Sequence, residues 1–562
     1  MSQSMLRVAP IVLRFSAAGT LLGVLIGCFR WSSPWPALSG LNLLWTATAG
    51  WLVGLAVGCG VAMAFRSRSR HLPRSSRGPW QRVGAAALVV VGLAPGAVWL
   101  ALPMTSGPSR GVGPMSRLRG DCRPNIILIG IDALRADHVG AYGSVAGLTP
   151  NLDAFAREAS VYRSAYASSP WTLTSMGALA SSLPPSQCVV ARRNGEDPRA
   201  YTFRAALLRD APLVAESLQE AGYRTAAELT NPFLTQRYGW ERGFDCLRNE
   251  DGSDTNLLLT SQTTRGEIVT ENARAWLALN RKEPFLLWLH YLDPHAPYDS
   301  PDTPESLRKQ YPPNWETRRT YWYDEMAGAS PEERVRYREF CRRMYAEEVR
   351  YADRCVGGLL AELKRKRLYD DSLIVIFSDH GEELFDHGAF EHGHSLHEEV
   401  LHVPLLVKWP KGTEADPSVT QIVSLASISP TLVEVAGLPR QAGAAASSLP
   451  RQDGGPGEMV YSEAPLFGSD QTALTTDRYK AIYHLSADGG DGSFEIYDRR
   501  RDPGEQLDLA TGRTAAELRD HLREMTERAL TARREASRDE PRSGELDEAA
   551  KRRLRSLGYL SE

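Results

Sequence analysis

Lysine is scarce in this chain of 562 residues: only eight of its 65 basic residues are lysines, and the rest are arginines. Such a composition is typical of GC-rich bacterial genes. The chain also lacks an excess of charge of one sign, because 68 acidic residues leave a net charge of −3. This balance argues against a nucleic-acid-binding protein, which needs a dominating basic face. Seven cysteines are too few for a disulfide scaffold, and an apolar fraction of 43% excludes bulk disorder.

Charged residues are nearly missing from three stretches near the start of the sequence. Residues 41–65 and 83–104 contain none, and residues 8–29 contain only Arg14, which lies where a helix end lets its side chain reach the headgroups. Each stretch is as long as the roughly 20 residues that a helix needs to span a bilayer. A cleaved signal peptide is the alternative for the first stretch, but the nearest cleavage pattern falls inside the second. We therefore predict a membrane anchor of about three transmembrane helices in residues 1–104.

The loops between these stretches predict the orientation of the anchor. Only Arg30 lies between the first two stretches, whereas six arginines lie between the second and the third: Arg66, Arg68, Arg70, Arg74, Arg77 and Arg82. Arginine-rich loops stay in the cytoplasm. The sequence thus predicts a multi-pass protein of the cell (inner) membrane. Its remaining residues are expected to lie outside the cytoplasm, which in a bacterium means in the periplasm.

The rest of the sequence predicts a body of alternating strands and helices. Continuous apolar runs that end in polar residues are typical of buried parallel strands, and they occur at residues 125–132, 285–293, 373–381 and 403–410. Amphipathic stretches between them predict helices at residues 172–183, 211–222 and 332–366. This alternation favours an α/β fold with a largely parallel sheet flanked by helices.

Composition also suggests how this body is divided. Residues 105–122 are rich in Gly, Pro and Ser and are expected to form a linker, after which residues 123–410 form the catalytic α/β domain. Residues 411–510 contain several strand-like segments and predict a small C-terminal β-rich subdomain. Residues 511–562 are charged and predict a helical tail.

Histidines and carboxylates gather at the predicted ends of two strands. Asp132 ends one apolar run, and Asp379 and His380 end another. Two carboxylates at one sheet edge repel each other unless a cation lies between them, so this pattern predicts a divalent metal site. The alternative is a solvated histidine-rich loop, because six histidines crowd into residues 380–402.

Seven motifs, taken in order, resemble the sulfatase family of the alkaline phosphatase superfamily. They are PNIILIGIDALRADHVGAYG, TPNLDAFAREA, SPWTLTSM, DPHAPY, SDHGEEL, HEEVLHVPLL and EIYDRRRDPGEQLDL, and they span roughly residues 123–510. The resemblance implies an alkaline-phosphatase-like parallel sheet with a smaller C-terminal β subdomain. It also implies a divalent metal (Ca, Mn, Mg or Zn) held by Asp132, Asp379, His380 and the nucleophile.

The nucleophile position departs from the sulfatase pattern. Sulfatases convert a Cys or Ser at this position to formylglycine, but the aligned residue here is Thr172, so that no formylglycine is expected. Threonine is the nucleophile in the phosphodiesterase and phosphotransferase branches of the superfamily, and a bound metal lowers the pKa of such a hydroxyl. We therefore predict Thr172 as the nucleophile, with an ordinary helix N-cap as the alternative reading.

Two further departures weaken the likeness to a typical arylsulfatase. The family usually has two adjacent acids after the first strand, whereas here Asp132 is followed by Ala133. The Lys and His that hold sulfate in the family are missing after GYRT at residues 222–225. The missing carboxylate leaves the identity of the metal open, and the missing Lys and His remove two cationic sulfate contacts.

Several other polar residues are candidates for substrate contact. Asp293 and His295 resemble the substrate side of the family, and with His392 or His394 they would make a second metal site; the alternative is a strand-end turn built by Pro294 and Pro297. Arg135 would bind the substrate anion or else bridge to Asp137. We expect structural roles for three other histidines, His387, His397 and His402.

Together these features predict a membrane-anchored hydrolase that cleaves sulfate or phosphate esters outside the cytoplasm, with a membrane lipid or a sulfated or phosphorylated glycan as substrate. A head-group phosphotransferase acting on envelope lipids or glycans is the alternative within enzymes. A catalytically dead relative that binds anionic glycans is a further alternative, since conserved function does not follow from fold. Metal analysis separates the last reading from the first two, and the sequence indicates no oligomeric state.

Overall fold

The computed structural model describes most of the chain after residue 122. The described residues are 123–193, 203–248, 265–279, 284–441, 443–455, 457, 459–464, 470–486, 492–510 and 515–536. The predicted transmembrane helices at 8–29, 41–65 and 83–104 and the predicted linker at 105–122 lie outside these residues. Among the residues that are described, no helix combines the length and the apolar character that crossing a membrane requires.

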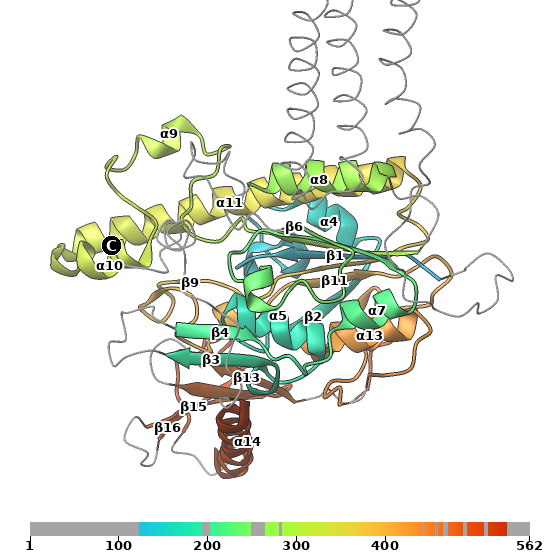
Figure 1. Ribbon diagram of the computed structural model, residues 1–562. Coiled ribbons are helices and arrows are strands. Elements are labelled where there is room, and N and C mark those ends of the chain that lie inside the picture. The colour runs from blue at the N-terminus through green and yellow to red at the C-terminus, as the bar shows by residue number, and fades with distance from the viewer. Residues whose placement is uncertain are drawn as a thin grey trace, which may run out of the picture. The chain divides into compact units, whose positions relative to one another are not determined.

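A sheet of eight strands forms the centre of the fold (Figure 1). Its spatial order is β12 (Ser418–Ser424), β2 (Ser160–Tyr166), β11 (Leu405–Lys408), β8 (Leu373–Phe377), β1 (Ile126–Ile131), β7 (Phe285–Tyr291), β5 (Arg224–Leu229) and β6 (Cys246–Arg248). Neighbouring strands run parallel, except that β11 is antiparallel to both β2 and β8. The predicted largely parallel sheet is therefore confirmed.

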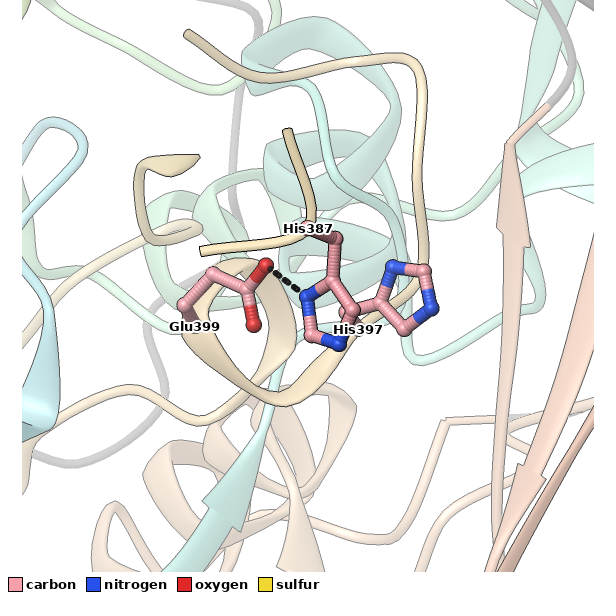
Figure 2. Close-up of side chains that lie close together, drawn as sticks. All are labelled: His387, His397 and Glu399. Atoms are coloured by element: carbon pink, nitrogen blue, oxygen red, sulfur yellow. Dashed lines mark hydrogen bonds and ion pairs between the residues drawn. The ribbon is translucent and has the colours of Figure 1, made fainter. Parts of the chain in front are cut away.

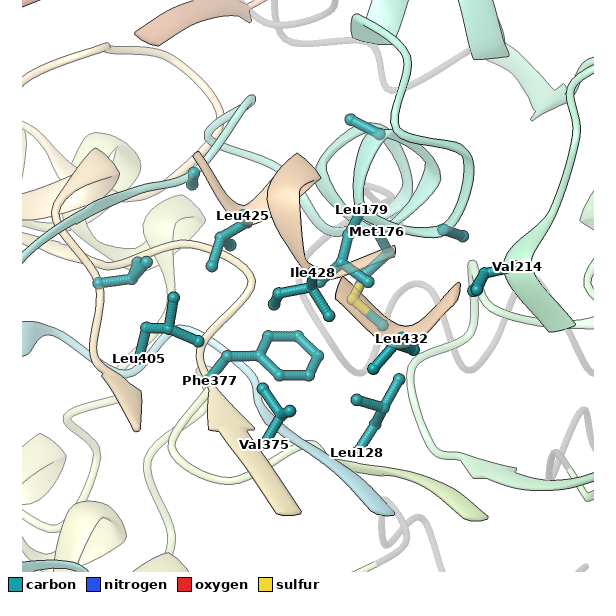
Figure 3. Packing of buried hydrophobic residues seen from close by; sticks show 14 of the residues in the cluster. Leu128, Met176, Leu179, Val214, Val375, Phe377, Leu405, Leu425, Ile428 and Leu432 are labelled. Atoms are coloured by element: carbon teal, nitrogen blue, oxygen red, sulfur yellow. The ribbon is translucent and has the colours of Figure 1, made fainter. Parts of the chain in front are cut away.

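Helices cover both faces of this sheet, which explains why its central strands are apolar throughout. One face carries α5 (Thr172–Ser181), α7 (Val214–Glu220) and α13 (Ile428–Val435), and the other carries α4 (Pro150–Ala156), α8 (Gly266–Leu279) and α11 (Pro331–Arg365) (Figure 1). Figure 3 shows the first interface, where Phe377 and Val375 of β8 and Leu128 of β1 pack near Met176 of α5 and Leu432 of α13. This packing fixes α5 on the sheet.

The longest helix, α11, begins at a clear sequence signal. The Ser330 hydroxyl accepts a hydrogen bond from the Glu333 amide, and the Glu333 side chain bonds back to the Ser330 amide, which forms a capping box. Pro331 occupies the first helical turn, where its missing N–H costs nothing.

A second sheet follows in the chain and is entirely antiparallel. It contains β13 (Val460–Ala464), β14 (Gln471–Thr475), β15 (Tyr479–His484) and β16 (Ser493–Asp498), each paired with the next. Helix α14 (Ala515–Ala536) packs on it through Leu522, which joins a small core with Leu474, Ala481 and Ile496. The predicted C-terminal β-rich region is present.

The central sheet extends further along the chain than the predicted boundary at residue 410. Strand β12 lies in the region assigned to the β-rich subdomain, but it pairs in parallel with β2 of the central sheet. Its mixed polarity, SVTQIVS, reflects an edge strand that is half exposed and therefore carries no continuous apolar run.

Short elements complete the described fold. Two hairpins are formed by β3 (Val189–Arg193) with β4 (Phe203–Leu207), and by β9 (Glu383–Leu384) with β10 (Phe390–Glu391). The short helices are α6 (Pro185–Cys188), α9 (Glu305–Arg308), α10 (Arg319–Asp324) and α12 (Glu398–Leu401).

Candidate active site

Strand pleating brings Asp132 and Asp379 to the face of the sheet that carries α5. Side chains alternate between faces along a strand, and Leu128 of β1 and Phe377 of β8 both belong to the core beneath α5. Asp132 and Asp379 follow these residues at even spacing, just past the carboxyl ends of adjacent parallel strands. Both carboxylates are completely buried.

Thr172 reaches the same point from the first position of α5. Its hydroxyl oxygen lies 3.1 Å from His380 Nε2. His380 Nδ1 lies 2.9 Å from the Gly381 carbonyl oxygen, so Nδ1 carries the proton and donates it there. Burial lowers the pKa of His380 and keeps the ring neutral. Nε2 is therefore an acceptor, and the Thr172 hydroxyl donates to it.

Asn231 is a member of the site that the sequence analysis missed. Its Nδ2 donates to Asp132 Oδ2 at 2.8 Å and to Thr172 Oγ1 at 3.1 Å. The Phe233 amide donates to Asn231 Oδ1 at 3.0 Å, which fixes the orientation of the side-chain amide. Only its position could have indicated Asn231 as a site residue: it lies just past the carboxyl end of β5, at the same sheet edge as the two acids.

The two carboxylates lack the partners that buried carboxylates normally have. Asp132 Oδ1 and Asp379 Oδ2 are buried without a hydrogen bond among the described residues, and each lies 3.5 Å from His380 Nε2. Burial and the charge of Asp379 raise the pKa of Asp132 well above its usual value. Burial also acts to raise the pKa of Asp379, but His380 and His290 outweigh it and hold this pKa at about 2. The two adjacent buried carboxylates therefore repel each other, and a positive charge near them would stabilise both.

These residues fit a divalent cation. Asp132, Asp379 and His380 offer two oxygens and one nitrogen within 4.8 Å of one another, and the Thr172 hydroxyl adjoins them. Carboxylate and imidazole donors suit divalent cations from Mg²⁺ to Zn²⁺. The orphaned oxygens of Asp132 and Asp379 are the observation that favours a cation, since unpaired buried carboxylate oxygens are costly.

Ala133 has a backbone conformation that is unusual for its residue type. Its φ is 59°, in the left-handed region that Asp and Asn tolerate better than Ala. Its amide donates to Asp379 Oδ1 at 3.4 Å, and its carbonyl accepts from the Tyr345 hydroxyl at 2.7 Å. These bonds hold the strained turn at the end of β1.

His295 and His392 lie beside His380. The rings of His380 and His392 have centroids 4.2 Å apart, and those of His295 and His392 4.8 Å apart. His392 Nδ1 lies 2.8 Å from Glu382 Oε1, and the Tyr298 hydroxyl donates to Glu382 Oε2 at 3.0 Å. Burial lowers the pKa of His295 to about 4, so that its ring is neutral near pH 7.

Two predicted members of this group point elsewhere. Asp293 accepts from the Gly266 amide at 2.9 Å and from Arg265 at 3.1 Å, and so caps the start of α8. His394 Nε2 lies 2.9 Å from Glu383 Oε2. Within the described part of the chain, no set of close metal ligands contains Asp293, His295, His392 or His394.

Arg135 bridges to Asp137, which the sequence analysis gave as the alternative to binding the substrate anion. It donates to both carboxylate oxygens of Asp137, at 2.9 and 2.7 Å, and to Asp386 Oδ2 at 2.7 Å. A further bond reaches the Glu382 carbonyl at 3.1 Å. Its guanidinium thus ties the end of β1 to the segment after β8.

A second group of potential ligands consists of His387, His397 and Glu399 (Figure 2). The two imidazole rings stack with centroids 3.7 Å apart and planes 7° apart. Because the lone pair of an imidazole nitrogen lies in the ring plane, two parallel rings do not direct their lone pairs at one ion. Burial lowers the pKa of His387, but its bonds to Glu399 and to the Glu505 carbonyl raise it to about 9. An ion pair between His387 and Glu399 explains this group better than a metal.

Comparison with known families and proteins gives consistent matches. A family model described as Sulfatase matches residues 124–438, and one described as N-sulphoglucosamine sulphohydrolase, C-terminal, matches residues 385–532. The Delta 4,5-hexuronate-2-O-sulfatase of Bacteroides thetaiotaomicron is 24% identical over 472 residues, covering 78% of this chain and 94% of that protein. Arylsulfatase K of Canis lupus familiaris is 25% identical over 481 residues, covering 74% and 85%.

Solved structures share the fold at low sequence identity. A protein in complex with its substrate D-glucosamine-2-N,6-O-disulfate has a TM-score of 0.56 and 18% identity, covering 75% of this chain and 100% of that one. The phosphonate monoester hydrolase of Agrobacterium radiobacter has a TM-score of 0.53 and 19% identity, covering 74% and 96%.

Proposed function

The chain belongs to the sulfatase family and is an ester hydrolase, and from this membership together with the site we propose that Thr172 is its nucleophile. The observation that carries the proposal is the position of the Thr172 hydroxyl, which accepts from Asn231 Nδ2 and lies 3.1 Å from His380 Nε2, the nitrogen that would bind the cation. A hydroxyl that is oriented by one donor and adjoins a cation site has a defined lone pair for attack.

The residues of the chain account for both bonds that change. Thr172 Oγ1 gives its proton to solvent and bonds to the sulfur or phosphorus atom, while the bond to the leaving oxygen breaks and that oxygen takes a proton from His392. Water then attacks the Thr172 ester and gives one proton to His392, the sulfate, phosphate monoester or phosphonate is released, and the Thr172 oxygen takes a proton back from solvent. A divalent cation held by Asp132, Asp379 and His380 would supply positive charge that lowers the pKa of the Thr172 hydroxyl. An acceptor alcohol in place of water would give the transferase reaction.

His392 is the residue that we propose to protonate the leaving oxygen. Its Nδ1 is anchored by Glu382 Oε1 at 2.8 Å, and a carboxylate partner favours the protonated ring. His295 is less suited to this role, because burial leaves its pKa at about 4. We assign His295 to substrate contact as a neutral hydrogen-bonding group.

The charges near Thr172 favour a substrate with one negative charge. A divalent cation would balance the carboxylates of Asp132 and Asp379, and Arg135 is already held by Asp137 and Asp386. A sulfate monoester carries one charge, whereas a phosphate monoester approaches two near pH 7. We therefore propose a sulfate ester of a glycan, in keeping with the names of the relatives. Phosphodiesters and phosphonate monoesters carry the same charge and are the second candidate, which a threonine nucleophile favours.

A panel of chromogenic substrates tests this proposal. We expect p-nitrophenyl sulfate or p-nitrophenyl phenylphosphonate to be hydrolysed with a kcat/KM at least about tenfold above that of p-nitrophenyl phosphate. Preference for the doubly charged phosphate would contradict the charge assignment, and hydrolysis of none of the three by metal-loaded protein would favour a binding protein.

We also propose that residues 8–29, 41–65 and 83–104 anchor the enzyme in the inner membrane with its catalytic domain outside the cytoplasm. The support is the absence of charge in these stretches and the arginine-rich loop between the second and the third. Such an anchor would restrict the enzyme to glycans or lipids near the bilayer.

A further inference from the structure

His290 is a buried histidine that neither the predicted site nor the mechanism uses. It lies in β7, its side chain is completely buried, and neither ring nitrogen has a hydrogen-bond partner among the described residues. Burying an imidazole without partners costs free energy, and buried polar groups in native proteins are normally satisfied. An orphaned imidazole therefore calls for an explanation at this position.

The ring of His290 faces the two carboxylates of the site. Its Nε2 lies 3.9 Å from Asp132 Oδ2 and 3.9 Å from Asp379 Oδ2, too far for hydrogen bonds. In the register of β1 and β7, His290 is opposite Gly130, and a Cβ at Gly130 would lie 3.2 Å from His290 Cδ2. The glycine leaves the space in which the ring reaches the sheet edge.

We propose that His290 is a ligand of the divalent cation held by Asp132 and Asp379, in place of the acid that the family carries at the position of Ala133. This inference rests on the cation of the proposed function. It adds a nitrogen ligand from β7 beside the turn after β1, where Ala133 stands in place of a carboxylate.

Each distance from His290 to a carboxylate oxygen is short enough for both atoms to bind one ion. Two ligand atoms that each lie about 2.0–2.2 Å from one ion are at most about 4.4 Å apart. His290 Nε2 lies 3.9 Å from Asp132 Oδ2 and from Asp379 Oδ2, and His380 Nε2 lies 3.5 Å from Asp132 Oδ1 and from Asp379 Oδ2. The set of ligand atoms that all lie within 4.8 Å of one another contains Asp132, Asp379 and His380 but not His290, so the His290 ring would move toward the ion on binding. Exchanging a carboxylate for an imidazole favours Zn²⁺ over Ca²⁺ or Mg²⁺.

The competing explanation is that His290 is a core residue that merely balances the charge of the two acids. The two explanations differ in what removal of the ring does. Loss of a metal ligand weakens metal binding and changes the ligand field of the bound ion. Loss of a charge-balancing core residue destabilises the metal-free protein and leaves the ligand field unchanged.

Co²⁺ is the probe that separates them, because its visible absorption reports the number and type of its ligands. The full-length protein and the His290→Ala variant are stripped with chelator, titrated with Co²⁺, and melted with and without the ion. We expect His290→Ala to bind Co²⁺ at least about tenfold more weakly, with an altered spectrum and a smaller metal-induced rise in Tm. His402→Ala, which removes a histidine bonded to the Arg163 carbonyl, is the control and should match wild type.

A rescue variant tests the exchange itself. Ala133 already has the left-handed backbone that Asp tolerates, so Ala133→Asp combined with His290→Ala should recover Co²⁺ binding. An unchanged Co²⁺ spectrum and affinity in His290→Ala would overturn the ligand assignment, and failure of the double variant to recover binding would overturn the exchange with position 133. Wild-type protein that binds no Co²⁺ would instead contradict the cation of the proposed function.

Discussion

The role of Asn231 in the site becomes visible only in the folded chain. Asp132, Asp379, His380 and Thr172 stand in motifs, and the structure brings all four together. Asn231 and His290 stand in no motif that the sequence analysis used, and both matter through their place at a strand end. A polar residue just past a buried strand is a usable signal, but it is shared by many residues that only cap a turn.

Arg135 shows the opposite case, in which the residue was found but its role stayed open. The sequence placed it near Asp132 with two possible partners, a substrate anion or Asp137. Its donors reach Asp137 and also Asp386, which lies 251 positions along the chain. Contacts between residues so far apart in the sequence depend on tertiary structure and cannot be predicted from the spacing of residues within a motif.

Replacement of Asn231 by Ala should lower kcat by about 100-fold, the size of effect seen when one donor to a reacting oxygen is lost. The variant removes the hydrogen bond to Thr172 and the one to Asp132 while leaving the nucleophile in place. Steady-state kinetics with the preferred substrate provide the measurement.

The matched control is Asn272→Ala in α8, whose side-chain amide donates to Glu228. It should retain wild-type kcat. A kcat for Asn231→Ala within about threefold of wild type would show that the asparagine does not orient Thr172.

At the scale of elements, apolar runs identified the strands that carry the site. The runs at 125–132, 285–293 and 373–381 correspond to β1, β7 and β8, and the stretch at 332–366 corresponds to α11. Strands β2 and β12 were missed because exposed and buried residues mix along them. The antiparallel direction of β11 also did not follow from its apolar sequence, since strand direction is set by the connections around it.

The segment from β9 to α12 meets the C-terminal residues through charged pairs. His387 bonds to Glu399 through Nδ1 at 2.8 Å and to the Glu505 carbonyl through Nε2 at 3.0 Å. Because both ring nitrogens of His387 face acceptors, both must donate a proton, and the ring is protonated in these contacts. Lys480 of β15 adds an ion pair to Glu505 at 3.1 Å. These contacts couple the loop beside the site to the second sheet.

Stability should therefore decrease as pH rises from about 6.5 to 9. The pKa of His387 is about 9 in the folded protein and about 6.5 in the unfolded chain. The folded state binds more protons in this window, so the contribution of His387 is complete below pH 6.5 and is lost as pH rises through 9. Because water reaches part of the ring, we expect a loss of only about 1 kcal/mol. Urea unfolding at both pH values measures it.

The variant His387→Gln should show a smaller decrease between the two pH values, while His521→Gln, at an exposed position of α14, should behave as wild type. If His387→Gln loses as much stability as wild type between pH 6.5 and 9, another group controls this dependence.

At the scale of the whole molecule, membership of the sulfatase family was evident from the order of the motifs, and the family model confirms it over residues 124–438. The membrane anchor rests on composition alone, because apolar length and the arginine-rich loop are sequence properties. The extent of the central sheet, which includes β12 beyond residue 410, depended on pairing with β2 and could not be read from the chain.

The proposed topology places the C-terminus outside the cytoplasm. An alkaline phosphatase fused after Glu562, which is active only outside the cytoplasm, should be active, and a green fluorescent protein fused at the same position by the same export route should be dark. The reverse pattern would put the catalytic domain in the cytoplasm and contradict the anchor orientation. Fusion after Arg77, in the arginine-rich loop, is the internal control and should give the opposite result to fusion after Glu562.

The central claim is that Thr172 forms a covalent ester with the transferred group. Thr172→Ala should lower kcat by several powers of ten at nearly constant Tm, because Trp171 and not Thr172 is the N-cap of α5 and loss of a hydrogen-bonded hydroxyl costs only about 1 kcal/mol. Thr172→Ser should keep partial activity. Thr174→Ala, which removes a neighbouring buried hydroxyl bonded to the Trp171 carbonyl, should keep near wild-type kcat.

Rapid acid quench during turnover, followed by peptide mapping by mass spectrometry, tests this claim most directly. The account predicts a sulfuryl or phosphoryl adduct on Thr172, in the peptide that begins α5, and no adduct in Thr172→Ala. An adduct on another residue, or near wild-type turnover by Thr172→Ala, would contradict it.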